Sequence, residues 1–141
     1  MARPNGLVRL AWLAHTAAWL VPVHKDGVRL PKGLPGWQAF RIAMSPVWHY
    51  YEGGGAWDPW YGALLVLTSG MTNIVMVASV PIAFWGTPRQ RTVLAWLSLV
   101  AVVVNAQWVI DKEWADLRAG YYLWWASFLV IAVGFLRRRQ A

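Results

Sequence analysis

Hydrophobic residues dominate four stretches of the chain, and none of the four contains a formal charge. Each stretch is rich in Ala, Val, Leu and Trp. A helix that crosses the hydrocarbon of a bilayer needs about 20 mostly apolar residues, and a charge inside it is costly. The pattern therefore predicts an all-α, polytopic membrane protein with four transmembrane helices, over about residues 10–24, 60–85, 92–110 and 120–136.

The first predicted span is the shortest, with 15 uncharged residues between Arg9 and Lys25. Its length is also typical of the apolar segment of a signal peptide. Trp12, His15 and Trp19 are unusual in such a segment, so we expect a retained helix. Snorkelling of Arg9 and Lys25 toward the membrane surfaces would compensate for its short length.

The loop between the first two predicted spans, residues 25–59, contains an amphipathic pattern. Residues 34–45 place Trp37, Phe40 and Met44 at positions i, i+3 and i+7, on one face of a helix. An amphipathic helix beside a span normally lies flat in the membrane interface. We therefore predict one interfacial helix here, with these three side chains as a ridge that docks a partner.

Aromatic residues continue after Pro46 and flank the flexible run of glycines at residues 53–55. Trp48, Trp57 and Trp60 extend the predicted docking surface. Aromatic rings also mark the ends of the predicted spans, where an amphipathic ring is favoured. We assign these as membrane-interface anchors: Trp60, Tyr61, Trp85, Trp108, Trp114, Tyr121, Tyr122, Trp124 and Trp125.

The basic residues lie at the ends of the spans rather than in one stripe. The net charge is +7, and this distribution favours membrane lipid over nucleic acid as the partner. Seven of the 13 lysines and arginines are concentrated at the amino terminus, the turn at residues 87–91 and the carboxyl-terminal tail. The positive-inside rule then predicts a multi-pass protein of the bacterial inner membrane with both termini in the cytoplasm.

The length of 141 residues predicts a single domain over residues 1–141. The chain contains no cysteine, which excludes disulfides and thiolate metal sites. We predict no metal site.

His15 lies near the centre of the first predicted span and shares a helix face with Trp12 and Trp19. An ionisable group at that depth suggests a function. Three roles stay open: a hydrogen bond to another helix, ligation of a metal or pigment, and titration. We predict Trp12, His15 and Trp19 as the candidate cofactor contact, with lipid, quinone, carotenoid or (bacterio)chlorophyll as the candidate ligands.

Asn73, Asn105 and Gln107 are the amides inside the predicted spans. Buried amides commonly hold transmembrane helices together, and we assign these three to that role. A polar pocket between the second and third spans, around Asn73 and Asn105, is the alternative. No Asp, Glu, Lys or Arg accompanies them inside the spans, and this argues against a coupled transporter.

The loop also contains an imidazole and two carboxylates, from His49, Glu52 and Asp58. These groups are sufficient in principle for acid–base chemistry. Nothing in their spacing orders them as nucleophile, base and orienting group, so we predict no catalytic residue and no enzyme.

The pattern as a whole favours a non-catalytic accessory subunit that packs against other integral membrane subunits. The expected setting of this subunit is an energy-transducing complex of photosynthesis or electron transport, either a photosynthetic reaction centre with its antenna or a respiratory complex. A stand-alone membrane protein that binds or transports a lipid or small solute is the alternative.

Overall fold

The computed structural model describes residues 4–26, 30–44, 47, 60–110 and 115–137. It is all-α apart from one small sheet. Three helices in this part of the chain are long and apolar enough to cross a membrane. They are α4 (Trp60–Trp85), α5 (Pro88–Ile110) and α6 (Ala119–Arg137), and they lie within a few residues of the second, third and fourth predicted spans.

The first predicted span is wrong in its bounds. Helix α1 covers Gly6–Leu20, so it begins before residue 10 and ends before residue 24. Asn5 caps its first turn by accepting a hydrogen bond from the Val8 amide at 2.9 Å. Pro22 ends it, because proline holds the preceding residue, Val21, in an extended conformation. With 15 residues, α1 is not one of the three long apolar helices.

A two-stranded antiparallel sheet follows α1, and the sequence pattern did not predict it. Strand β1 (Pro22–Asp26) pairs with β2 (Leu30–Pro35). The segment before α6 joins the outer side of β1: the Lys25 amide donates to the Asp116 carbonyl, and the Arg118 amide donates to the Val23 carbonyl. The extended backbone after α1 therefore has hydrogen-bond partners on both sides.

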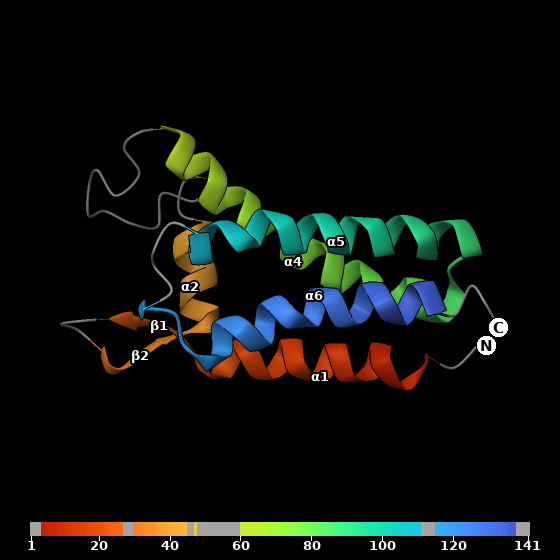
Figure 1. Cartoon of the computed structure of the whole chain (residues 1–141), viewed down its shortest axis with the longest axis horizontal. Helices are drawn as coiled ribbons and strands as arrows, with labels where there is room; N and C mark the ends of the chain where they lie inside the picture. Colours follow the sequence, from red (N-terminus) through yellow and green to blue (C-terminus); the bar gives the residue numbers. More distant parts are fainter. Residues whose placement is uncertain (1–3, 27–29, 45–46, 48–59, 111–114, 138–141) are drawn as a thin grey trace.

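Helix α2 (Gly36–Ala43) lies inside the predicted helical range of 34–45. It runs across one end of the helical bundle rather than along it (Figure 1). The helix begins directly after Pro35, and Pro35 and Gly36 bring it close to the end of α1. A Cβ atom on Gly36 would lie 2.3 Å from the carbonyl oxygen of Ala18, so only glycine permits this approach.

The turn between α4 and α5 is a capping box. The Thr87 amide donates to Gln90 Oε1 at 2.8 Å, and the Gln90 amide donates to Thr87 Oγ1 at 3.3 Å. Pro88 occupies the first position of α5, where its missing amide hydrogen costs nothing. This local chemistry explains why α5 begins four residues before the predicted span.

Helices α1 and α6 run side by side in opposite directions, so the start of α1 and the end of α6 lie at the same end of the bundle (Figure 1). Asn5 donates to the Gly134 carbonyl at 2.7 Å near that end. At the other end, a Cβ on Gly120 would lie 2.6 Å from the Pro22 carbonyl oxygen. Glycines thus allow α1 and the start of β1 to approach α6 closely along most of its length.

Polar side chains lie inside the bundle beside apolar core residues such as Phe128 and Ile131, and many large aliphatic side chains lie on its outer surface. The buried polar set is His15, Ser69, Thr72, Asn73, Ser79, Ser98, Asn105 and Ser127. Val77, Val103 and Ile110 are each more than 70% exposed. This arrangement is typical of helices surrounded by lipid, because hydrocarbon solvates aliphatic side chains and not amides or hydroxyls.

Candidate functional site

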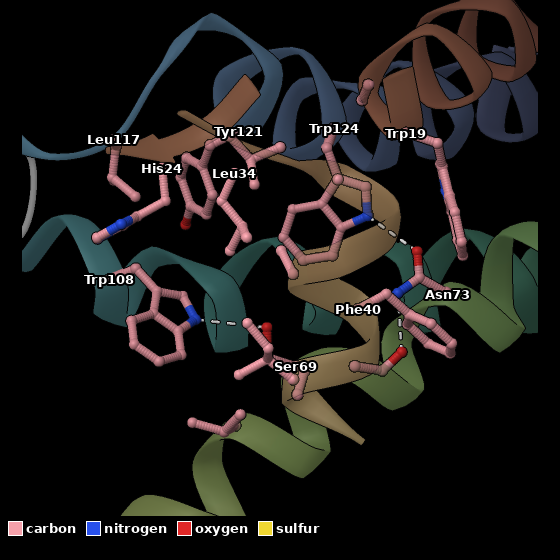
Figure 2. Close-up of a pocket in the computed structure, with 18 residues that line it drawn as sticks. Trp19, His24, Leu34, Phe40, Ser69, Asn73, Trp108, Leu117, Tyr121 and Trp124 are labelled. Carbon is pink, nitrogen blue, oxygen red and sulfur yellow. Dashed lines mark hydrogen bonds between the residues drawn. The ribbon is translucent and has the colours of Figure 1, made fainter. Parts of the chain in front are cut away.

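A cavity of about 360 Å³ lies where α2 crosses the ends of the other helices (Figure 2). Five elements besides α2 contribute to it: α1, the β1–β2 hairpin, α4, α5 and α6. Its volume is within the range of sites that bind small molecules. The lining residues are Ala18, Trp19, Val23, His24, Leu34, Gly36, Ala39, Phe40, Ile42, Ala43, Val66, Ser69, Gly70, Asn73, Trp108, Leu117, Tyr121 and Trp124.

Helix α2 closes one side of the cavity because a glycine on α4 lets it approach. A Cβ on Gly70 would lie 3.1 Å from Met44 Sδ and 3.3 Å from the Ala43 side chain. On its other side, Phe40 packs against Trp19 of α1, with ring centroids 5.2 Å apart. The cavity thus depends on α2 being held at both ends.

Aromatic rings from four helices form much of the wall. Trp19 comes from α1, Phe40 from α2, Trp108 from α5, and Tyr121 and Trp124 from α6 (Figure 2). The rings of Tyr121 and Trp124 lie 5.8 Å apart. Trp108, Tyr121 and Trp124 were assigned from the sequence to membrane-interface anchors, but here they face the inside of the protein.

Asn73 is the polar centre of one end of the cavity. Its Oδ1 accepts a hydrogen bond from Trp124 Nε1 at 2.9 Å, and its Nδ2 donates to the Gly70 carbonyl at 2.8 Å (Figure 2). The amide also lies close enough to His15 to interact with its imidazole. Asn73 therefore links α4 to α6 and to α1 while it lines the cavity.

Asn105 of α5, fully buried, forms a second polar centre behind the cavity wall. Its Oδ1 accepts from Ser69 at 2.5 Å, and its Nδ2 donates to the Ala101 carbonyl at 2.7 Å and to Thr72 Oγ1 at 3.3 Å. Its backbone carbonyl accepts from the Tyr121 hydroxyl. This one residue joins three helices.

The lining residues include no Asp, Glu, Lys or Arg. His24 also lines the cavity, and its Nδ1 donates to the Lys25 carbonyl at 2.5 Å. In the described part of the chain, no three His, Asp or Glu residues gather closely enough to hold a metal ion. The chemistry that the cavity offers is apolar contact, aromatic stacking and hydrogen bonding.

His15 is buried between α1 and α6 and does not line the cavity. Its Nδ1 lies 3.1 Å from Ser127 Oγ. Ser127 donates its own proton to the Trp124 carbonyl, so His15 is the donor in this contact. The imidazole also packs edge-on against Phe128, at 5.5 Å between centroids. An interhelical hydrogen bond, one of the three roles open from the sequence, is present in the structure.

The other two members of the predicted cofactor contact separate. Trp12 donates from Nε1 to Ser79 Oγ at 2.7 Å and stacks on Phe84, which ties α1 to α4. Trp19, two turns further along α1, lines the cavity. Residues that the sequence places on one helix face thus reach two different surroundings.

The predicted docking ridge is divided in the same way. Met44 is buried and Phe40 faces the cavity, so both contact their own chain. Trp37 is 39% exposed and lies beside Arg41, whose guanidinium carbon is 5.7 Å from the ring centroid. A docking role stays a prediction for Trp37. Trp48 and Trp57 lie outside the described residues, as does the side chain of Trp60.

Gln107 is the third predicted interhelical amide, and its Nε2 is buried without a hydrogen-bond partner among the described residues. It does not line the cavity. The predicted acid–base cluster of His49, Glu52 and Asp58 lies outside the described residues.

Comparisons with known proteins give no relative. No family model, no curated protein and no solved structure matches this chain.

The Asn105 network gives a first prediction. Replacing Asn105 with alanine removes the acceptor of Ser69 and the donor to Thr72, and we expect it to lower the free energy of unfolding by about 1–3 kcal/mol. Unfolding by SDS in mixed micelles measures this. Val103→Ala on the same helix, at a position 73% exposed, is the control and should change stability by under about 0.5 kcal/mol. Equal effects of the two variants would contradict the structural role of Asn105.

Proposed function

We propose that this protein is a membrane-embedded binding protein for a lipid-soluble small molecule. The observation that carries the proposal is the cavity of about 360 Å³, walled by rings and aliphatic side chains with a few hydrogen-bonding groups. Small-molecule sites are typically concave and mostly apolar, with a small number of placed polar groups. This function is the alternative that the sequence offered, with a pocket between the second and third spans around Asn73 and Asn105. Of these two residues only Asn73 lines the cavity, which extends to the end of α1.

A fourth membrane crossing by α1 is part of the proposal. Helix α1 and the start of β1 lie along α6 from Gly134 to Gly120, so a bilayer that α6 crosses also surrounds α1. About 22 Å of helix, at 1.5 Å per residue, is shorter than a hydrocarbon core of about 30 Å. The paired β1 strand continues the path with its backbone hydrogen bonds satisfied.

The charges support the same arrangement. Arg9, Arg89, Arg91 and Arg137 belong to the end of the bundle that holds the α4–α5 turn, and none of the described acidic residues lies there. Lys25 and Asp116, 3.6 Å apart, belong to the opposite end, with the cavity and α2. By the positive-inside rule the arginine end faces the cytoplasm of a bacterial inner membrane. The cavity then lies near the outer leaflet, with α2 at the membrane surface.

Labelling of single cysteines tests this topology, and the absence of native cysteines makes it direct. Thr87→Cys, in the α4–α5 turn, should react with a membrane-impermeant maleimide only after the cells are opened. Ala115→Cys, exposed before α6, should react in intact spheroplasts. The reverse pattern would place the cavity at the cytoplasmic leaflet, and labelling of both from one side would contradict the proposed crossings.

A cavity-filling substitution tests the binding function. Ala39→Phe adds a ring to the wall that α2 contributes, and we expect it to reduce co-purifying small molecules by about 10-fold or more, the loss of about 1.4 kcal/mol of binding. Mass spectrometry of an organic extract of the purified protein measures the amount. Ala126→Phe, on the exposed face of α6, is the matched control and should retain the wild-type amount. Equal retention by both variants would contradict binding in this cavity.

Helix α5 favours a second candidate, the accessory subunit of a larger membrane complex. It has the smallest buried share of the three long apolar helices, and its outer face exposes Trp96, Val100 and Val103. A neighbouring integral membrane subunit could cover that face, and a pigment, carotenoid or quinone could lie between them.

Native mass spectrometry after gentle extraction separates the two candidates. If this protein is a subunit, it should be detected in a complex with larger partners. Trp96→Ala should then release it from the complex, because the substitution removes a large contact area. A free monomer in the mildest detergent would contradict the subunit role and leave the binding protein.

A further inference from the structure

One hydrogen-bond donor in the cavity wall has no acceptor among the described residues. Among the partly buried tryptophans in the described part of the chain, Trp12, Trp108, Trp124 and Trp125 each donate from Nε1 to another residue. Trp19 lines the cavity and makes ring contacts with His15 and Phe40, but its indole nitrogen donates to no described residue. The indole nitrogen is not one of the fully buried polar atoms that lack a partner, so it remains open to a partner from outside the chain.

The surroundings of Trp19 indicate what would satisfy this donor. Trp19 lies at the same end of the cavity as Asn73 and Phe40 (Figure 2). The Asn73 carbonyl oxygen already accepts from Trp124. A bound molecule that offers an acceptor, such as a carbonyl oxygen, would supply the partner that none of the residues in the described ranges provides.

The charge and shape of the wall restrict the ligand further. A charged ligand would lose its hydration in the cavity without meeting an opposite charge, because no Asp, Glu, Lys or Arg side chain lines the wall. Rings from Trp19, Phe40, Trp108, Tyr121 and Trp124 favour a planar group that can stack. The volume accommodates one small ring system with a short apolar tail.

We propose that the ligand is a neutral, planar carbonyl compound of the quinone type, and that Trp19 Nε1 donates a hydrogen bond to one of its carbonyl oxygens. This inference rests on the proposed binding function and adds the ligand class and the residue that selects it. The proposal assigns ligand binding to the cavity and includes no electron transfer.

The test compares three ligands and two matched variants. The ligands are an alkyl-benzoquinone, an alkylbenzene that has the same tail but no carbonyl, and a diacylglycerol. Trp19→Phe keeps an aromatic ring and removes the indole N–H. Trp12→Phe removes the same group from the same helix at a position outside the cavity, where the donor already has Ser79 as its partner. Titration of the detergent-solubilised full chain, followed by native mass spectrometry, gives each dissociation constant.

We expect the wild-type protein to bind the quinone more tightly than the alkylbenzene. Trp19→Phe should weaken quinone binding by about 3- to 10-fold, the effect of one hydrogen bond, and leave alkylbenzene binding unchanged. Unchanged alkylbenzene binding also shows that the variant is folded. Trp12→Phe should alter neither constant.

Equal weakening of both ligands by Trp19→Phe, or no weakening of either, would overturn the assignment of Trp19 while the binding function stands. Tighter binding of a diacylglycerol than of the quinone would overturn the planar ligand class. If the quinone, the alkylbenzene and the diacylglycerol all fail to bind the wild-type protein, the proposed function itself fails.

Discussion

The internal pairing of polar groups is the constraint on which the rest of this structure depends. Helices in hydrocarbon gain little from burying more hydrocarbon, so amides, hydroxyls and indoles must supply specific contacts between them. Asn105 shows this most directly, because its side chain reaches Ser69 and Thr72 of α4 while its carbonyl accepts from Tyr121 of α6. The rotation of three helices about their axes is fixed at this point.

Close backbone contact completes what the polar pairs begin. Glycines at 120 and 134 let α1 and the first residues of β1 lie against α6, and Gly36 and Gly70 let α2 cross the bundle end. Helix α2 is held by both α1 and α4. The space that α2 covers is therefore walled by side chains of these helices and forms the cavity. The same packing that stabilises the bundle therefore creates the site.

The tryptophan that α1 contributes to the cavity wall differs in its hydrogen bonding from the other partly buried tryptophans among the described residues. Trp12, Trp108, Trp124 and Trp125 each donate from Nε1 to another residue, whereas the indole of Trp19 donates to no residue that the structure describes. In the proposed function, an apolar wall with an open indole N–H and no Asp, Glu, Lys or Arg favours a neutral ligand that carries a hydrogen-bond acceptor. The arginine-rich end of the bundle, on which the proposed membrane orientation rests, contributes no residue to this site.

The sequence by itself determined that the protein is helical and where its three long apolar helices lie, because composition and the spacing of charges depend only on the chain. It also marked Asn73 and Asn105 as interior amides. It placed the end of the first helix too late, since the weight of apolar residues up to His24 concealed the local effect of Pro22. It also could not find the sheet, whose strands are short and carry no clear alternation.

Only the tertiary structure decided which aromatic side chains turn inward. A tryptophan at the end of a span has the same local sequence signature whether it anchors the membrane surface or lines a cavity, and Trp108 and Trp124 do the latter. Trp19 and Phe40 meet through the crossing of α2, a contact between segments that no periodicity relates. The site is a product of helix rotation and crossing, and these follow from packing across the whole bundle rather than from any one stretch of residues.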